Sequence, residues 1–370
     1  MAARPGELPG WVDLALLPLL NLAAAFLVSG LIVLLVGENP LQALRLLIFG
    51  AFGYAEAIGY TLFYATSFIF TGLAVAIAFH CGLFNIGGEG QAYVGGLGVA
   101  LVGLHLGWLP WALVVPLAML AAAAFGGFWA FIPGWLQARR GSHVVITTIM
   151  FNFIASALMT YLLVNVLIAP GQQIPETATL PQSAWLPQMH QLMAAFGVEI
   201  ARSPLNLSFV FALLCCVLFW LFVWQTRYGY ALRVVGQNET AAVYGGISPP
   251  RQIMLAMTLS GALAGLVALN MIMGAQHRLT LDFTGGFGFV GIAVALMGRN
   301  HPLGIVLASL LFGALYQGGS ELSFDLPALS RDIVVVIQGL VILFAGALEH
   351  MFRPSLEALF GRPAPAGAVA

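Results

Sequence analysis

Lysine is absent from this chain: all thirteen of its basic residues are arginine. A phosphate-binding P-loop needs a lysine to reach the terminal phosphates of a nucleotide, so the chain cannot contain one. Enzymes that form a Schiff base through lysine are excluded for the same reason. Any ATP that drives this protein must therefore be bound by a partner chain.

Charge of either sign is also scarce. Only 7% of the 370 residues are charged and 61% are apolar, whereas soluble proteins carry about 25% charged residues. The net charge of −1 provides no basic field for nucleic acid. Many apolar runs have about 20 residues, enough to cross a bilayer core of about 30 Å. We therefore expect an all-α, polytopic membrane protein whose residues 1–370 form a single transmembrane domain.

Cysteine is rare, and nothing in the sequence has the spacing of a metal site. Cys81, Cys215 and Cys216 lie in or beside apolar runs, which is typical of small core or lipid-facing residues. The seven histidines show no HExxH motif or comparable ligand spacing. We predict no catalytic residue, no metal site and no cofactor in this chain.

The apolar runs predict about ten membrane segments. The first is longer than the apolar part of a signal peptide and lacks a strong basic region before it, so we expect it to be retained. The eighth is too short to span alone and is typical of a broken helix that protein buries. The segments are 14–36, 58–80, 88–104, 108–132, 143–167, 206–225, 251–273, 286–298, 302–319 and 332–351.

The positions of the arginines predict the orientation, because cytoplasmic loops are enriched in basic residues. With a cytoplasmic N-terminus, nine arginines lie inside: Arg4, Arg139, Arg140, Arg227, Arg233, Arg251, Arg299, Arg353 and Arg362. Four lie outside: Arg45, Arg202, Arg278 and Arg331. The bias favours two cytoplasmic termini.

Two segments outside the spans are predicted on the external face. Residues 39–53 have apolar positions at helical spacing and carry Arg45, which is typical of an interfacial helix. Residues 169–205 form a long loop rich in glutamine and proline, in which Trp185 is a candidate interface anchor.

Residues 226–250 form the longest polar segment on the predicted inner side. Residues 237–244 are expected to form a short helix, with Asn238 as its N-cap and Gly245–Gly246 as its stop. Such a helix either docks into a groove of a soluble partner or rests on the membrane as a solvated loop. The sequence favours neither.

A glycine-rich segment at residues 82–96 separates two apolar runs. It contains six glycines, and Asn85, Glu89 and Gln91 lie among them. Glycine allows the backbone to leave helical geometry or to approach a neighbour closely. One interpretation is a broken helix that lines a solute path. The other is that Glu89 only joins helices at the membrane edge.

A second glycine-rich segment covers residues 283–299. Phe287 and Phe289 flank Gly288, and aromatic faces near a pore could stack on a planar ring. Ordinary core packing is the alternative. The similar composition of residues 82–103 hints at an internal repeat, which is also found in secondary transporters.

Four blocks carry a resemblance to a known family. They are GLAVAIAFHCGLFNIGGEGQ (residues 72–91), VVITTIMFNFIA (144–155), ALRVVGQNETAAVYGGI (231–247) and GFGFVGIAVALMGRNHPLGI (286–305). With these blocks and its order of spans, the chain resembles the permease subunits of bacterial ABC importers for nucleosides and simple sugars. These are related to the ribose and branched-chain amino-acid permeases.

The resemblance implies a fold and a set of partners. The fold would be the ten-helix type of the vitamin B12 importers. This chain and a shorter paralogous permease would form a pore in the bacterial inner membrane. Two cytoplasmic ATPase subunits would bind ATP and Mg²⁺ and drive it, and an external binding protein would deliver the solute.

The resemblance also implies roles for individual residues. The family's coupling segment corresponds to residues 233–246 and includes Arg233, Gly236, Asn238, Glu239, Ala242 and Gly246. Candidate residues of the substrate pathway are Asn85, Glu89, Gln91 and Asn152, to which the aromatic argument adds Phe287 and Phe289.

The leading hypothesis is the pore-forming subunit of an ATP-driven importer for nucleosides. An ion-coupled secondary transporter or a channel for a small polar solute is the alternative, and it would need no ATPase. An intramembrane enzyme is disfavoured, because the four aspartates, Asp13, Asp282, Asp325 and Asp332, do not cluster.

Overall fold

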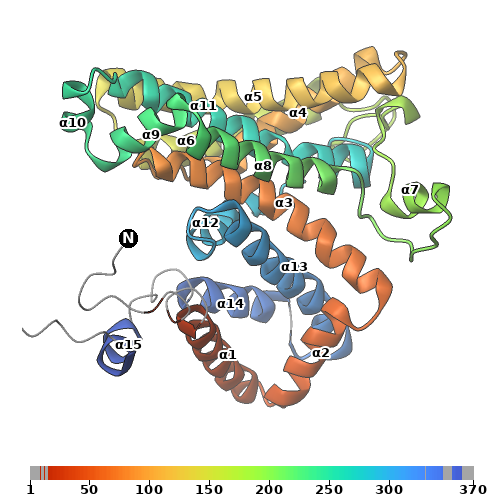
Figure 1. Ribbon diagram of the computed structural model, residues 1–370. Helices are drawn as coiled ribbons and strands as arrows, with labels where there is room; N and C mark the ends of the chain where they lie inside the picture. Colours follow the sequence, from red (N-terminus) through yellow and green to blue (C-terminus); the bar gives the residue numbers. More distant parts are fainter. Residues whose placement is uncertain (1–8, 10–11, 13–15, 330, 345–351, 361–370) are drawn as a thin grey trace, which may run out of the picture. The chain divides into compact units, whose positions relative to one another are not determined.

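The computed structural model describes residues 9, 12, 16–329, 331–344 and 352–360 (Figure 1). Parts of the first and last expected spans, residues 14–15 and 345–351, lie outside these ranges, as do Arg4 and Arg362. Within the described ranges every regular element is a helix, and β-pairing is limited to the isolated bridges Glu176–Thr280 and Gln188–Asn206. The expectation of an all-α protein is confirmed.

Six helical segments are long and apolar enough to cross a membrane. They are α3 (Ala55–His80), α5 (Trp111–Arg140), α6 (Val144–Asn165), α8 (Ser208–Gln225), Pro249–Gln276 and α13 (Pro302–Asp325). Segment Pro249–Gln276 comprises α11 (Pro249–Gly265) and the π-helix η3 (Leu269–Gln276). A seventh candidate is the bent pair formed by α1 (Leu17–Leu35) and α2 (Pro40–Phe52), whose axes differ by 117°.

The other expected spans are helices of different character. α4 (Gly88–Leu106) has 19 residues, but its glycines and polar side chains make it less apolar than the six. α12 (Phe287–Met297) has only 11 residues, so the prediction of a segment too short to span is confirmed. α14 (Arg331–Ile342) has 12 described residues. The count of ten membrane passes stays a prediction.

The chain divides into two compact units. Unit 1 comprises residues 1–50 and 318–370, and unit 2 comprises residues 51–317. In unit 1, α1 packs against α14, and the core contains Val33, Ala43, Leu322, Leu329, Val334 and Ile337. α1, α2, Leu322 and Ile337 also line an apolar groove of about 540 Å³. The last described helix is α15 (Arg353–Phe360).

The α2 helix is confirmed within the segment predicted to be interfacial. It begins at Pro40, directly after Asn39, whose Oδ1 accepts a hydrogen bond of 2.9 Å from the backbone N–H of Leu41. Proline suits the first turn of a helix, because the N–H that it lacks would have no partner there. Sequence signals at the start of this helix therefore explain why the chain turns after α1.

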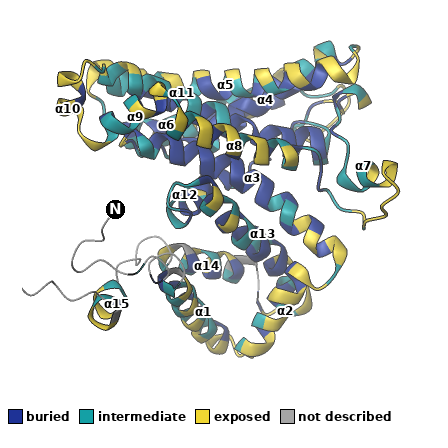
Figure 2. Ribbon diagram, viewed as in Figure 1, coloured by how far each residue is buried: buried dark blue, intermediate teal, exposed yellow. Residues whose placement is uncertain are grey.

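Helix α3 is the centre of unit 2. In its most apolar stretch 83% of the residues are buried, whereas the corresponding shares are 33% in α5, 22% in α6 and 28% in α8 (Figure 2). α3 packs against α8, α11 and α12, and α11 also packs against α4 and α5. Because α5, α6 and α8 are apolar yet exposed, their outer faces suit lipid or another membrane subunit.

Close helix packing in unit 2 depends on glycine. A Cβ atom on Gly95 of α4 would lie 2.5 Å from the Cα of Gly265 on α11. Small residues let backbones approach in this way, and the contact gains dispersion energy rather than hydrophobic energy inside a membrane. The glycines of the first glycine-rich segment are thus partly explained by packing.

The polar connections of unit 2 lie at its two opposite ends (Figure 1). One end carries α9 (Arg227–Gln237) and α10 (Glu239–Tyr244). The other carries the loop between α6 and α8, which contains the short 3₁₀-helix η2 (Gln182–Ala184) and α7 (Met189–Ala195).

Candidate functional site

Two buried amides hold the chain where α3 and α4 are separated. After α3 ends, residues 83–87 leave helical geometry, and α4 begins at Gly88. The Asn85 side chain accepts hydrogen bonds from the N–H of Gly87 (2.8 Å) and from Gln91 Nε2 (3.1 Å). It donates to Gln91 Oε1 (2.9 Å) and to Ser260 Oγ on α11 (2.8 Å). Both amides are 1% exposed, so they supply the partners that a helix would otherwise provide.

Asn152 of α6 supports the same break from the other side. Its Nδ2 donates to the carbonyl oxygen of Ile86, and its Oδ1 accepts from the N–H of Gly90, both at 2.9 Å. Asn152 therefore satisfies one backbone acceptor before α4 and one donor in its first turn. The structure brings Asn85, Gln91 and Asn152 together, as scaffolding of one irregular backbone segment.

Glu89 joins the start of α4 to the start of α12. Its Oε1 accepts from Thr284 Oγ1 (2.5 Å) and from the N–H of Gly286 (2.8 Å), and its Oε2 accepts from the N–H of Gly288 (2.7 Å). The first N–H groups of a helix lack intrahelical partners and carry partial positive charge, so a carboxylate is stabilised there. A Cβ atom on Gly288 would overlap the backbone of Glu89, so only glycine allows this approach. This geometry corresponds to the interpretation in which Glu89 joins helices.

The two phenylalanines that flank Gly288 have different surroundings. Phe287 is 4% exposed and packs edge-on against Phe68, with ring centroids 5.3 Å apart. Tyr64 and Tyr316 also contact this ring. Phe289 is 48% exposed. Core packing thus describes Phe287, whereas Phe289 presents an aromatic face outward.

The segment predicted to couple to an ATPase comprises two short helices. Asn238 is the N-cap of α10, because its Oδ1 accepts from the N–H of Ala241 at 2.9 Å, and the chain leaves the helix through Gly245 and Gly246. The predicted cap and stop are confirmed. Ala242 is buried and anchors α10, whereas Glu239 is exposed. Val243 and Tyr244 are 60% and 89% exposed, although they are apolar and aromatic.

Helix α9, the first helix of this segment, lies against the turn that precedes the break between α3 and α4. A Cβ atom on Gly236 would overlap the carbonyl oxygen of His80 and lie 2.8 Å from the backbone nitrogen of Gly82. The backbone of α9 therefore rests directly on the turn that ends α3. This turn leads to Asn85. A movement of α9 would therefore displace the chain that leads into α4.

Comparison with known proteins assigns the family. Residues 57–346 match the family described as the permease component of branched-chain amino acid transport systems. The chain belongs to this permease family. It is 37% identical over 335 residues to the guanosine ABC transporter permease NupP of Bacillus subtilis, covering 90% of this chain and 93% of NupP.

Two further relatives cover nearly the whole permease. The glucose ABC transporter permease TsgB13 of Haloferax volcanii is 32% identical, over 97% of this chain and 95% of its own length. The nucleoside ABC transporter permease NupB of Lactococcus lactis is 33% identical, over 89% and 90%. The chain is thus a membrane-spanning transport subunit of an ABC importer and not an enzyme.

The permease has a second buried polar network that the sequence analysis missed. Asn270, in η3, is fully buried and donates to the carbonyl oxygen of Phe63 and to Ser67 Oγ, both at 2.9 Å. Its Oδ1 accepts from Asn206 Nδ2 (2.9 Å) and from Ser208 Oγ (3.0 Å). A lone asparagine within the apolar run 251–273 was the available signal, because polar groups inside a membrane are costly without partners.

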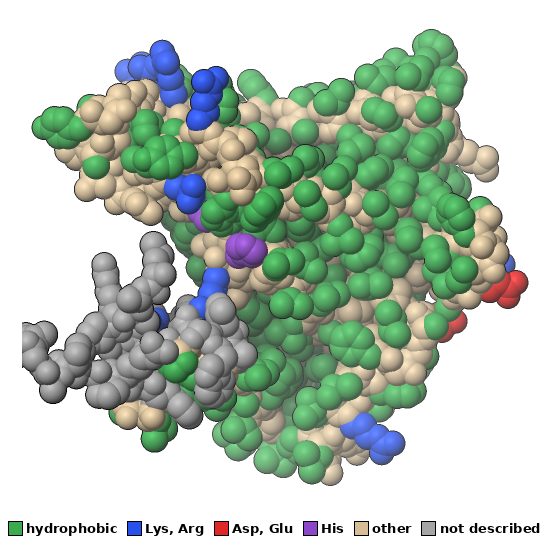
Figure 3. All heavy atoms as spheres, in the orientation of Figure 1, with side chains coloured by type: hydrophobic (Ala, Val, Ile, Leu, Met, Phe, Trp, Pro, Cys, Tyr) green, Lys and Arg blue, Asp and Glu red, His purple; other side chains and the backbone are tan. Residues whose placement is uncertain are grey.

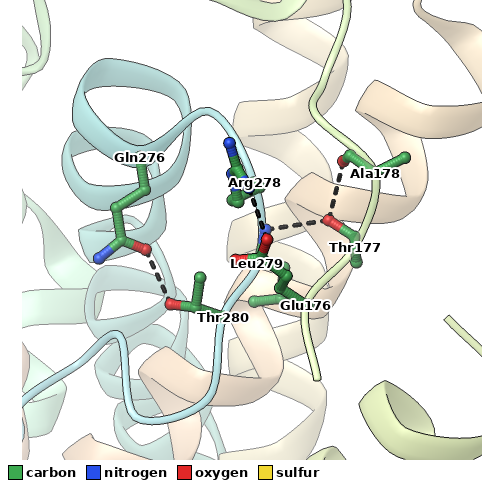
Figure 4. Close-up of polar contacts among 7 residues, drawn as sticks. All are labelled: Glu176, Thr177, Ala178, Gln276, Arg278, Leu279 and Thr280. Atoms are coloured by element: carbon green, nitrogen blue, oxygen red, sulfur yellow. Dashed lines mark hydrogen bonds and ion pairs between the residues drawn. The ribbon is translucent and has the colours of Figure 1, made fainter. Parts of the chain in front are cut away.

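The end of the permease that carries α7 is held by contacts across the chain (Figure 4). Arg278 Nη1 donates to Glu176 Oε1 at 2.5 Å, and the N–H of Leu279 donates to Thr177 Oγ1 at 3.1 Å. These contacts fix the loop after α6 to the end of η3.

Trp185, the candidate interface anchor, packs within this same end. Its ring stacks on His277, with centroids 3.8 Å apart, and its Nε1 donates to the carbonyl oxygen of Leu180. Burial lowers the pKa of His277, which favours the neutral imidazole against the indole. Trp185 thus packs inside this end of the protein, and its role as an interface anchor stays a prediction.

Proposed function

We propose that this permease forms, with a second and shorter permease subunit, the pore of an importer that carries nucleosides into a bacterial cell. Separate ATPase subunits bind ATP and Mg²⁺, and an external binding protein delivers the solute. The names of two relatives, NupP for guanosine and NupB for nucleosides, support this solute class. The glucose permease TsgB13 makes simple sugars the second candidate.

The contact of Gly236 with the turn at His80–Gly82 is the observation that carries the proposal. The exposed residues of α10 are linked to the turn before the α3–α4 break through α9, because only Asn238 separates α10 from α9 and Gly236 of α9 lies against that turn. Coupling by a soluble ATPase needs such a mechanical link. Arg233, Glu239 and Gly246 belong to the same segment in this proposal, and the fold is the ten-helix type of the vitamin B12 importers.

We also infer the roles of the pathway residues. Asn85, Gln91 and Asn152 stabilise the irregular start of α4, and Glu89 ties α12 to it. A shift of this junction would change access to the pore, which is alternating access without covalent chemistry. Phe289 is the candidate to stack on a nucleobase, because its ring is half exposed at the start of α12.

The distribution of arginine supports an orientation in the inner membrane in which α10 and both termini face the cytoplasm. Six arginines belong to the α10 end of unit 2: Arg139, Arg140, Arg227, Arg233, Arg251 and Arg299. Only Arg202 and Arg278 belong to the opposite end. Basic residues are retained on the cytoplasmic side during insertion.

Uptake measurements test the solute and the energy source together. A strain that lacks this gene is complemented with the wild-type gene and given radiolabelled guanosine, with nucleosides, free bases, pentoses and glucose as competitors. Guanosine uptake that only nucleosides compete supports the proposal. Absence of guanosine uptake, together with uptake of radiolabelled glucose by the same strain, supports the sugar alternative. Uptake that stops on ATP depletion but continues with a proton ionophore supports the ABC mechanism. The reverse response would establish ion coupling.

A further inference from the structure

A cluster of basic and aromatic side chains lies at the α10 end of unit 2. His80 ends α3, Trp224 lies near the end of α8, and His301 precedes α13. The Trp224 ring contacts both histidine rings, with centroids 5.2 Å from His80 and 5.3 Å from His301. His80 Nε2 lies 3.1 Å from the carbonyl oxygen of Asn300. We call His80, Trp224, Arg233 and His301 the α9 basic cluster.

The cluster itself contains basic and aromatic side chains, and the carboxylate of Glu239 lies close enough to act on Cys81, the residue next to His80. Arg233 and His301 are the charged or titratable side chains whose electrostatic effect on His80 is largest. The guanidinium Nε of Arg233 is buried, and no group among the described residues accepts its hydrogen bond. A buried donor without a partner destabilises a protein, and more so when it is charged. An anion at this position would remove that destabilisation.

The cluster continues into an apolar surface. Leu214, Val217, Leu218 and Leu221 of α8 are 41–54% exposed and follow one another at helical spacing, in line with Trp224. A helix of 18 residues is about 27 Å long, which is enough for the length of an acyl chain. Figure 3 shows histidine and arginine side chains next to a broad hydrophobic surface on this face of the protein.

We propose that the α9 basic cluster binds the phosphate of an anionic phospholipid whose acyl chains lie along α8. Phosphate matches the charge and offers oxygen acceptors to Arg233 and the histidines. Trp224 lies at the junction of the basic and apolar parts, as interfacial tryptophan does at headgroup level. A soluble anion would not use the apolar α8 face, whereas the acyl chains of a phospholipid would lie along it.

The ligand would act on coupling through Arg233. This residue belongs to α9, whose Gly236 rests on the turn that ends α3. A headgroup bound to Arg233 would therefore stabilise the position of α9 against α3. The inference depends only on the protein lying in a membrane and holds for any transported solute.

Native mass spectrometry of the full-length permease, purified in detergent, tests the proposal. The protein is delipidated and offered phosphatidylglycerol or phosphatidylcholine. We expect retention of phosphatidylglycerol by the wild type and about tenfold less by Arg233→Gln, the loss typical of one charge-assisted hydrogen bond. The control is Arg227→Gln on the same helix, where the arginine lies 5.4 Å from the Tyr228 ring centroid, outside the cluster. It should retain phosphatidylglycerol like the wild type.

Further arms distinguish the sources of the anion. Arg233→Lys keeps a positive charge and should retain most of the phosphatidylglycerol, which separates charge loss from misfolding. Glycerol phosphate should not displace the lipid, because it lacks acyl chains. Equal retention by the wild type and Arg233→Gln would overturn the proposal, as would equal binding of phosphatidylcholine. Unchanged lipid binding with loss of ATPase from the Arg233→Gln complex would identify the cluster as a protein contact instead.

Discussion

Glu89 shows how a single carboxylate can organise two helices of a membrane protein. Its oxygens accept three hydrogen bonds from residues 284–288, two of them from backbone N–H groups at the start of α12. A carboxylate in or near a bilayer is costly unless such donors compensate it. The side chain thus acts as an external cap for α12, whose own N-cap, Gly286, has no side chain that could do so.

We predict that Glu89→Gln destabilises the permease by about 1.5–3 kcal/mol, the range for hydrogen bonds to a charged group. The amide keeps one acceptor oxygen but presents an NH₂ group to a backbone donor, and the charge at the helix start is lost. Denaturant unfolding in detergent measures the change. The matched control is Glu56→Gln, because Glu56 also lies in a first helical turn but is exposed. Equal effects of the two substitutions would contradict the role assigned to Glu89.

Local signals predicted individual residues where their partners are close in sequence. Asn238 was identified as an N-cap because its partner, Ala241, lies three residues later. The partners of Glu89 are about 200 residues away in sequence. Polarity near a span indicated that Glu89 needs a partner, but only the fold shows which one. Phe287 is a similar case, because its packing partners Phe68 and Tyr316 are also distant in sequence and only the fold identifies them.

Among the helices, α9 and α10 illustrate how tertiary contacts and capping hold a short element in place. α10 has six residues, too few for a stable isolated helix. It is held by the Asn238 cap and by burial of Ala242. α9 is fixed by Gly236 on the turn after α3. The sequence predicted α10 but not the helical geometry of α9, whose glycines and aromatic residues give a weak helix signal.

We predict that Tyr244→Ala weakens binding of the ATPase by about 2 kcal/mol, roughly thirtyfold in Kd, as for an aromatic hot spot. Tyr244 is 89% exposed on α10, so its removal should leave the unfolding of the permease alone unchanged. Co-purification and titration with the ATPase subunit measure the effect. Tyr161→Ala on α6, where the ring is 60% exposed, is the control.

We predict that Gly236→Val, in contrast to Tyr244→Ala, lowers the stability of the permease itself. Because its side chain would overlap the carbonyl oxygen of His80, the variant should unfold more readily in detergent before any ATPase is added. Normal ATPase binding by Tyr244→Ala would remove α10 from the coupling assignment, and normal stability of Gly236→Val would remove the contact between α9 and the turn.

For the protein as a whole, hydropathy predicted the positions of most helices but not which of the glycine-rich or bent ones cross the membrane. All six long segments coincide with expected spans, because apolar length is a property of the local sequence. The differences concern glycine-rich or bent elements. α4 and α12 depend on contacts with each other, and the pair α1–α2 bends by 117°. Such elements are stabilised by neighbours rather than by their own apolarity, so their number of membrane crossings does not follow from hydropathy.

Orientation is the property of the whole molecule that the arginines predict most directly. The test uses a variant without its native cysteines, of which Cys81 and Cys216 are buried, and one new cysteine at an exposed position. Thr240→Cys places it on α10, and Glu199→Cys places it on the loop between α6 and α8. In intact cells a membrane-impermeant maleimide should label Glu199→Cys only, because the arginine-rich end is retained in the cytoplasm. Permeabilised cells should show labelling at both positions, which controls for accessibility. Labelling of Thr240→Cys in intact cells would reverse the orientation and place α10 out of reach of a cytoplasmic ATPase.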